Sequence, residues 1–171
     1  MGEGRCRVSD GSDLWVLSLE NDGAVEPFFQ SSANHLDPQF SPDGKWIAYT
    51  SDESGRQDLP EIYVRAFGGS GQVWQASSNG GTTPRWNPNG LELFYGSRGR
   101  LMVVDVRPEG DPFLSRPKVL FEHTSWASFD VSPDGRRFVV TEVGEAAQGP
   151  IQLNLILNWT EELKRLVPTD E

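Results

Sequence analysis

One short turn motif that recurs three times at a near-constant spacing constrains the fold of this chain more than any other feature. Each copy is a small polar residue followed by Pro, then Asp or Asn, then Gly. The copies are Ser41-Pro42-Asp43-Gly44, Asn87-Pro88-Asn89-Gly90 and Ser132-Pro133-Asp134-Gly135, which start 46 and 45 residues apart. An apolar run follows each copy. Such a period predicts a repeat architecture, in which each unit buries its apolar surface against its neighbours.

The chemistry of the motif predicts a tight turn. Proline fixes φ at the second position of a type I turn, Ser or Asn suits the first position, and Gly suits the last. Followed by a left-handed residue, a type I turn closes a short β-hairpin. We therefore assign a structural rather than a catalytic role to nine turn residues: Pro42, Asp43, Gly44, Pro88, Asn89, Gly90, Pro133, Asp134 and Gly135.

Further strand-like segments recur between the turns. Three of them share a pattern rich in β-branched and aromatic residues, which favours strands: 13–19, 61–67 and 100–106. Segments 72–75 and 118–121 add a fourth strand to two of the units. Because four antiparallel strands in about 45 residues are typical of a propeller blade, the sequence predicts an all-β fold. It is a partial β-propeller of about three four-stranded antiparallel blades. Four strand tryptophans are expected to pack between blades: Trp15, Trp46, Trp74 and Trp86.

The blade spacing also predicts how the chain is divided. We expect a poorly ordered N-terminus, a half blade, two whole blades, an incomplete blade, and a short helix with a tail. Their bounds are 1–12, 13–30, 37–77, 83–122, 128–158 and 159–171. Thr160 can cap the start of the helix, and acidic residues in its first turn and basic residues in its last suit the helix dipole.

With its flanks, the motif at residues 39–51 resembles the repeat of the TolB-type, WD40-like β-propeller family. The copy at residues 84–95 differs from that pattern at Asn89, where the family usually has Asp. The chain lacks the Gly-His and Trp-Asp pairs of true WD repeats. The resemblance covers about residues 13–158 and implies a propeller fold.

Three segments are similar to the C-terminal propeller of bacterial transmembrane serine/threonine kinases: 51–56, 62–65 and 157–164. In that family the propeller has six or more blades, follows a kinase domain and a membrane helix, and is thought to sense something outside the membrane. The resemblance implies that this chain corresponds to the last three blades or so, as a fragment of a sensor propeller. It implies an extracytoplasmic location in such a parent, whereas the chain by itself is expected in the cytoplasm.

Composition argues against several functions. The net charge is −10 without a basic block, which argues against nucleic-acid binding. No apolar run approaches the roughly 18 residues of a membrane span, so we expect no membrane insertion by this chain. Two histidines and one cysteine make a His/Cys zinc site implausible, and we expect no metal and no cofactor. Asp52, Glu53 and Asp58 lack the spacing of a calcium loop and predict a solvated acidic loop.

Catalytic motifs are absent from the sequence. It has no Gly-rich phosphate loop, no His-Arg-Asp, no Asp-Phe-Gly and no Gly-x-Ser-x-Gly elbow. His123, Ser125 and Asp130 provide the residue types of a Ser/His/Asp triad, but only their proximity in sequence supports that interpretation. We therefore predict that the chain is not an enzyme.

The loops that enter the innermost strand of each blade face the central channel, and loops on a rigid scaffold often carry function. The candidate binding residues in these loops are Asn34, His35, Asp37, Thr82, Thr83, Arg85, Thr124, Ser125 and Trp126. They predict an interaction module for a protein or a small ligand. Two alternatives stay open: a half-propeller that dimerises through its open blade edges into a closed six-blade ring, and a peptidase-associated propeller.

Overall fold

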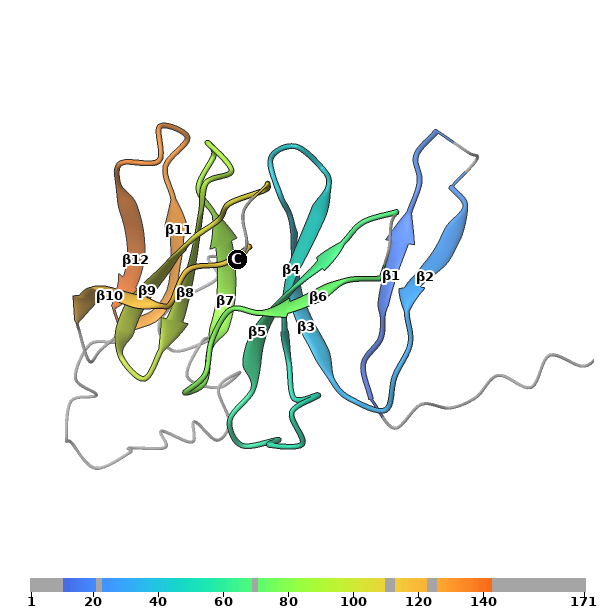
Figure 1. Cartoon of the computed structure of the whole chain (residues 1–171), viewed down its shortest axis with the longest axis horizontal. Helices are drawn as coiled ribbons and strands as arrows, with labels where there is room; N and C mark the ends of the chain where they lie inside the picture. The colour runs from blue at the N-terminus through green and yellow to red at the C-terminus, as the bar shows by residue number, and fades with distance from the viewer. Residues whose placement is uncertain (1–10, 21–22, 69–70, 110–112, 123–125, 143–171) are drawn as a thin grey trace, which may run out of the picture.

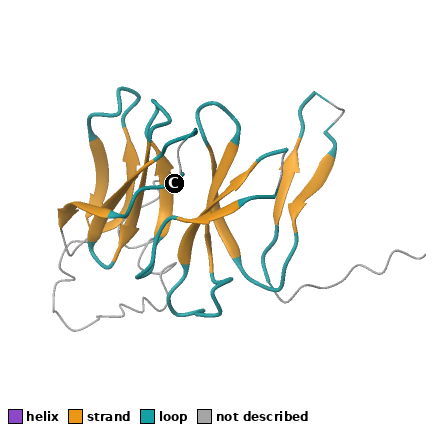
Figure 2. Cartoon of the chain, in the orientation of Figure 1, coloured by secondary structure: helices purple, strands orange, loops and turns teal. Residues whose placement is uncertain are grey.

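The computed structural model of the chain describes residues 11–20, 23–68, 71–109, 113–122 and 126–142. These residues form twelve strands and no helix (Figures 1 and 2). The all-β prediction is thereby confirmed. The predicted helix at 159–171, the end of the incomplete blade beyond residue 142 and residues 1–10 of the N-terminus lie outside the described residues.

Antiparallel hydrogen bonding arranges the strands into four sheets, which stand side by side in Figure 1. The N-terminal hairpin consists of β1 (Leu14–Leu17) and β2 (Val25–Phe29). The first blade contains β3 (His35–Phe40), β4 (Trp46–Ser51), β5 (Glu61–Ala66) and β6 (Val73–Gln75). The second blade contains β7 (Thr82–Trp86), β8 (Glu92–Ser97), β9 (Arg100–Asp105) and β10 (Lys118–Glu122). The C-terminal hairpin consists of β11 (Trp126–Val131) and β12 (Phe138–Glu142).

The strands β3, β7 and β11 are the innermost strands. Strand β3 contacts β7, and β7 contacts β11, although these strands belong to different sheets. Within each blade the remaining strands follow outward in chain order, so that β6 and β10 form the outer edges. The sheets thus fan out from a common axis, as the blades of a propeller do.

The three turn motifs form the same hydrogen-bonded turn. In the first copy the Ser41 hydroxyl donates to Asp43 Oδ1 at 2.6 Å and accepts the Trp46 N–H at 3.0 Å. The Gly44 N–H donates to the Ser41 carbonyl at 2.9 Å, and the φ of Gly44 is 70°, a left-handed value that glycine adopts without strain. The Ser41 hydroxyl donates to the Asp43 carboxylate, and this hydrogen bond lowers the pKa of Asp43 below its usual value. The Asp43 carboxylate therefore stabilises the turn by accepting hydrogen bonds within it.

The other two copies repeat this pattern. Ser132 donates to Asp134, whose pKa is lowered chiefly for that reason. In the second copy Asn87 takes the place of Ser, and its side-chain oxygen accepts the Asn89 N–H at 3.2 Å. Its amide nitrogen donates to Glu92 at 2.6 Å, which fixes the side chain in place.

Alternation along the strands directs apolar side chains to both faces of each blade. On β4, Tyr49 packs toward the N-terminal hairpin, whereas Ala48 packs toward the second blade. On β8, Tyr95 packs back toward the first blade, whereas Phe94 packs forward onto the C-terminal hairpin. Each blade therefore needs a neighbour on both sides to bury its apolar residues.

Three apolar joints connect the four sheets. The first joint, between the N-terminal hairpin and the first blade, contains Leu14, Ile47, Tyr49 and Tyr63. The second joint, between the two blades, contains eleven buried residues. The third joint, between the second blade and the C-terminal hairpin, contains Phe94, Leu101, Val103 and Phe129.

The four strand tryptophans differ in their surroundings. Trp86 is buried in the second joint, and the rings of Trp46 and Trp74 pack against Phe113 with centroids 4.7 and 4.3 Å apart. Trp15 instead has 54% of its surface exposed, because no described residue covers the outer face of β1. The expectation of packing between blades is thus wrong for Trp15 within the described part of the chain.

Neighbouring turns also contact each other across the third joint, which gives a test of this contact. A Cβ at Gly135 would collide with the Asn87 amide, whereas a Cβ at Gly44 would meet open space. Both glycines have a left-handed φ. We expect Gly44→Ala to lower the free energy of unfolding by about 1 kcal/mol through backbone strain alone. Gly135→Ala should lower it by about 2 kcal/mol or more, since it adds the collision. Urea denaturation of the two variants measures the difference, and equal losses would show that the turns do not rest on each other.

Candidate functional site

The three turn motifs lie at one end of the stacked sheets and the connections into β3 and β7 lie at the opposite end (Figure 1). The β8–β9 turn lies at that opposite end as well. We call this end the axial mouth, because the innermost strands begin there. It corresponds to the loops in which the sequence predicts a binding surface.

Each innermost strand begins with an irregularity in its pairing. The register shifts between Leu36 and Gln39 in β3, between Thr82 and Arg85 in β7, and near Ser128 in β11. Bulges of this kind bend a strand and redirect its side chains. The first residues of β3 and β7 are thereby turned out of the regular alternation at the mouth.

Two bulge residues have a left-handed backbone. The φ values are 52° for Asp37 in β3 and 56° for Thr83 in β7, at equivalent positions of the two blades. Asp tolerates this conformation, but a β-branched residue does so only at a cost. The strain at Thr83 is therefore held by the surrounding sheet.

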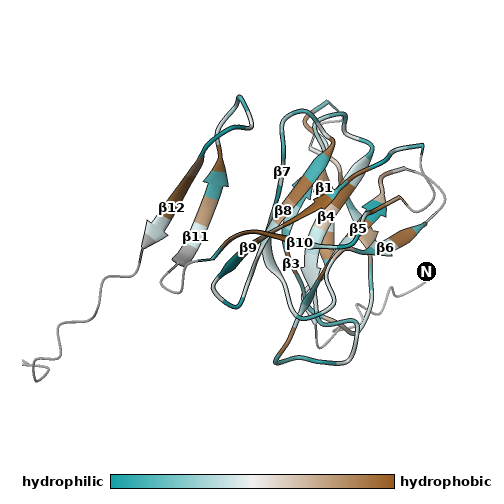
Figure 3. Cartoon of the chain, turned by 60° about the vertical axis from the view of Figure 1, so that its left-hand side comes forward, coloured by the Kyte–Doolittle hydropathy of each residue, from teal (hydrophilic) through white to brown (hydrophobic). Residues whose placement is uncertain are grey.

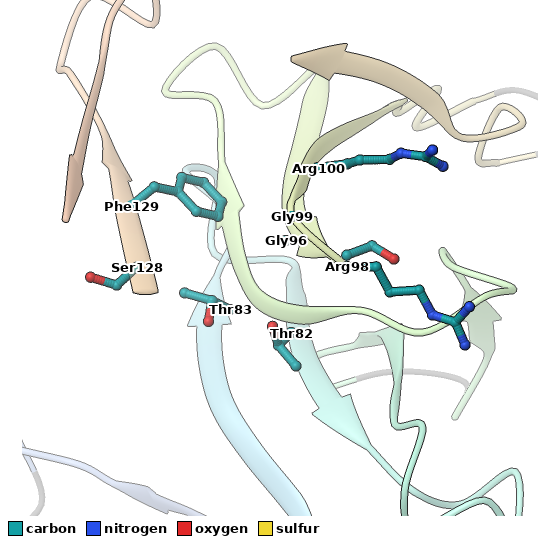
Figure 4. Close-up of a pocket in the computed structure, with 9 residues that line it drawn as sticks. Thr82, Thr83, Gly96, Arg98, Gly99, Arg100, Ser128 and Phe129 are labelled. Atoms are coloured by element: carbon teal, nitrogen blue, oxygen red, sulfur yellow. The ribbon is translucent and has the colours of Figure 1, made fainter. Parts of the chain in front are cut away.

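A cavity of about 180 Å³ opens at the mouth between the start of β7, the β8–β9 turn and the start of β11 (Figure 4). Its lining is rich in hydroxyl groups and in glycine: Thr82, Thr83, Gly96, Ser97, Arg98, Gly99, Arg100, Ser128 and Phe129. Phe129 is buried in the third joint and closes one side. The cavity thus combines hydrogen-bonding groups with one aromatic wall.

The two-residue turn between β8 and β9 forms the other side of this cavity. Arg98 and Gly99 have φ values of 49° and 75°, the positive values that a type I′ hairpin turn requires at both positions. In Figure 4 the side chains of Arg98 and Arg100 extend away from Ser128 and Phe129. The glycine-rich backbone of the turn therefore faces the cavity, and the two guanidinium groups point outward from the turn.

The positive charges at the mouth differ in their pairing. Arg100 Nε lies 3.0 Å from Glu122 Oε1, and Arg85 Nε lies 3.6 Å from Asp130 Oδ1. Arg98 forms no ion pair with any residue that the structure describes. It is exposed and leaves a positive charge at the rim of an otherwise acidic chain.

The structure separates the predicted binding residues into several groups. Thr82 and Thr83 line the cavity, whereas Arg85 pairs with Asp130 beside it. Asn34 donates its amide and its N–H to Asp52, at 2.7 and 2.8 Å, which lowers the pKa of that carboxyl. Thr124 and Ser125 lie outside the described residues, as does the side chain of Trp126.

His35 differs from the prediction of a loop residue at the mouth. It is the first residue of β3 and only 2% exposed, with its ring 4.5 Å from Phe29 and 5.5 Å from Tyr49, measured between centroids. Its Nε2 lies 2.8 Å from the Ser31 hydroxyl. Burial lowers its pKa, against the nearby carboxylates Asp13 and Asp52, which raise it. His35 is therefore a neutral packing residue beside the first joint.

Sequence reasoning missed seven of the nine residues that line the cavity: Gly96, Ser97, Arg98, Gly99, Arg100, Ser128 and Phe129. A signal for the turn is present, since two apolar strands separated by two residues that end in Gly are typical of a tight hairpin. The equivalent connection of the first blade spans 52–60, so only the second blade has this short turn. Phe129 has no such signal, because its place depends on how the sheets stack.

The described part of the chain has neither a cluster of metal ligands nor a membrane-spanning helix. There, no group of three His, Cys, Asp or Glu side chains gathers as a metal site would require. Those residues also include no helix long and apolar enough to span a bilayer. Of the triad candidates, Asp130 is described and pairs with Arg85, and His123 and Ser125 lie outside the described residues.

No protein-family model matches the chain. Among curated proteins it is 33% identical over 138 residues to a tricorn protease homolog of Streptomyces coelicolor, a match that covers 78% of this chain and 10% of that protein. It is 30% identical over 83 residues to the uncharacterized peptidase YuxL of Bacillus subtilis, which covers 48% of this chain and 12% of that protein. The match thus spans about a tenth of the length of each relative.

Solved structures resemble the chain in fold. TolB from Acinetobacter baumannii is 22% identical with a TM-score of 0.54, over 74% of this chain and 31% of that one. A TolB-like protein of Agrobacterium tumefaciens is 18% identical with a TM-score of 0.53, over 77% and 51%. A chain of a nidogen/laminin complex is 15% identical with a TM-score of 0.56, over 76% and 49%. Together with the four-stranded antiparallel sheets, these likenesses show a TolB-like β-propeller fold.

The burial of His35 predicts a loss of stability in mild acid. An unfolded histidine binds a proton below about pH 6.5, whereas the lowered pKa of His35 delays protonation of the folded protein to lower pH. Between these two pH values the unfolded state binds more protons, so the free energy of unfolding decreases as the pH falls. The decrease is at most about 1.4 kcal/mol per pH unit.

Replacing His35 by an uncharged residue isolates this effect. Urea denaturation at about pH 7.5 and about pH 5.5 should show a smaller loss in His35→Gln than in the wild-type chain. Carboxylates that do not interact with His35 contribute equally to both proteins and cancel in the comparison. Parallel pH profiles would contradict a buried, neutral His35.

The backbone strain at Thr83 predicts a stabilising substitution. Asn accepts a left-handed φ more readily than a β-branched residue, so Thr83→Asn should raise the free energy of unfolding by about 0.5–1 kcal/mol. Asp37→Asn is the matched control at the equivalent bulge of β3, where both residue types tolerate the conformation. Thermal or urea unfolding measures both. A Thr83→Asn variant less stable than the wild type would show that contacts of the Thr83 side chain outweigh the strain.

Proposed function

We propose that this chain is a non-catalytic binding module whose axial mouth binds a segment of polypeptide. The observation that supports it most is the cavity between β7, the β8–β9 turn and β11, where a strained Thr83 and the Arg98–Gly99 turn meet. Residues held in strained conformations cluster at functional sites. A rigid stack of sheets positions these groups, as a binding site requires.

The size of the cavity favours a polypeptide over a small molecule. Its volume of about 180 Å³ is below the roughly 300–1,000 Å³ of pockets that enclose drug-sized ligands. A peptide can place one side chain in the cavity while its backbone bonds to the hydroxyls around it. The exposed Arg98 at the rim favours a ligand with an acidic residue near that side chain.

Two parent proteins are consistent with such a module. The resemblance of residues 51–56, 62–65 and 157–164 supports the sensor propeller of a kinase-linked protein. The curated relatives, both named as peptidases or their homologs, support a peptidase-associated propeller that presents polypeptide to a catalytic domain. In both cases the chemistry would be carried out by a separate domain and this chain would supply binding. Sequencing the coding region on both sides of this chain distinguishes a kinase neighbour from a peptidase neighbour.

The binding proposal is tested with a peptide selected on the intact chain. A random peptide library displayed on phage provides the ligand, and fluorescence anisotropy of the labelled peptide gives its affinity. Gly96→Val should weaken binding at least about tenfold, because the added side chain would occupy the cavity, and about 1.4 kcal/mol is tenfold. A Cβ at Gly96 meets Thr82 Oγ1 at 3.6 Å, an ordinary contact, and valine favours strands, so the fold should tolerate it.

The matched control introduces the same side chain away from the mouth. Gln75→Val lies on β6, the outermost strand of the first blade, and should leave the affinity unchanged. Arg98→Ala should weaken binding of acidic peptides and leave neutral ones unaffected. If the Gly96 and Gln75 variants bind equally well, or if no peptide is selected, the mouth is not the binding site.

A further inference from the structure

The two end sheets of the described chain are complementary halves of a blade. Strand β1 corresponds to β5 and β9, the third strands, since Leu14 packs onto the following sheet as Ile62 and Leu101 do. Strands β11 and β12 correspond to the first two strands, because the turn at Ser132 joins them as the turn at Ser41 joins β3 and β4. The N-terminal hairpin thus has the outer half of a blade and the C-terminal hairpin has the inner half.

Each half presents an open strand edge to the other. In the whole blades the second strand pairs with the third, as β4 with β5 and β8 with β9. Among the described residues β12 pairs only with β11, and β1 pairs only with β2. Figure 3 shows the hairpin of β11 and β12 at one side of the molecule, with hydrophobic residues along β12.

We propose that two copies of the chain close a ring in which β12 of each copy pairs with β1 of the other. Each pairing completes a four-stranded blade in the order β11-β12-β1-β2. Two whole blades from each copy and two shared blades give six, within the four to eight blades of closed propellers. The arrangement has two-fold symmetry, so one chain provides both surfaces, and it leaves neither β1 nor β12 unpaired.

The register of the whole blades predicts which residues meet. Tyr49 pairs with Tyr63 in the first blade, and the repeat places Val140 at the position of Tyr49 and Trp15 at the position of Tyr63. By the same equivalence of positions, Phe138 would lie opposite Leu17, and Val139 would lie opposite Val16. All three pairs are apolar, and aromatic or β-branched pairs of this kind stabilise antiparallel ladders.

The shared blade would cover apolar surface that the described chain leaves exposed. Trp15 and Leu17 are 54% and 58% exposed, and Val139 is 69% exposed. Tyr63 and Met102, at the position of Trp15, pack onto the preceding sheet. In the ring Trp15 of one copy would lie beside Leu101 and Val103 of the other copy. It would thereby extend the third joint of that copy, an interface that already exists.

The negative net charge of each copy opposes this association. Each copy carries a net charge of −10, so added salt should strengthen the pairing by screening the repulsion.

Residues 151–158, expected to be a strand of the incomplete blade, lie outside the described residues and are one competitor for the edge of β12. Sedimentation and cross-linking distinguish pairing of β12 with a second copy from pairing with a segment of the same chain.

Sedimentation of the full chain over a wide range of concentration and salt is the first test. The ring predicts a species of twice the 19.0 kDa chain mass, which becomes more populated as salt rises, and no larger species. A monomer at all concentrations would overturn the proposal and favour an occupant from the same chain. Open-ended polymers would overturn it as well, because they would mean that the pairing does not close.

Cross-linking between two different variants tests the register. In a background with Cys6→Ser, a mixture of Trp15→Cys and Val140→Cys chains should form a disulfide-linked dimer, because directly opposed strand residues have the Cα separation that a disulfide needs. A mixture of Trp15→Cys and Val139→Cys chains is the matched control, since these side chains would lie on opposite faces. All three substituted positions are exposed in the single chain, so the fold should be retained. If the first mixture cross-links no better than the control, β12 does not pair with β1.

Discussion

Burial of both faces of every blade is the constraint on which the rest of the structure depends. The pleat alternates side chains, so a strand such as β8 presents Tyr95 to one neighbour and Phe94 to the other. No sheet in this fold can be stable by itself, because a single sheet would expose one apolar face to water. Stability is therefore a property of the joints. Buried apolar residues are most numerous at the second joint, whereas Trp15 and Val139 at the ends of the described stack are exposed.

The stack also gives the two ends of the sheets different freedom. At one end the three turns are nearly identical, because each is fixed by local hydrogen bonds such as those of Ser41 and Asn87. At the axial mouth the connections vary from two residues at Arg98–Gly99 to the stretch 52–60. The bulges at the starts of β3 and β7 redirect residues there, whereas the pairing of β4 with β5 and of β8 with β9 stays regular. The connections at the axial mouth thus differ between the two blades, whereas the turns that join the first two strands of each blade do not.

How far the structure follows from the sequence depends on the range of the interactions. The turns and the all-β blades were predictable, because Ser41, Asp43 and Gly44 interact within a few residues of one another. The burial of His35 was not, since its neighbours Phe29 and Tyr49 come from different strands. Thr82 and Thr83 could be placed at the mouth from their position before an apolar strand. Phe129 could not, because it reaches the cavity only through the stacking of the C-terminal hairpin on the second blade.

The self-contained turns have a consequence for how the chain folds. Every strand described here pairs with a strand next to it in sequence, and three of the hairpins are closed by a turn whose hydrogen bonds span at most five residues. Little loop entropy is lost in forming such a hairpin, so any of the three can nucleate first. The joints then need only adjacent hairpins to dock. A mutation in one turn should therefore slow folding locally, while the order in which the blades assemble can change to compensate.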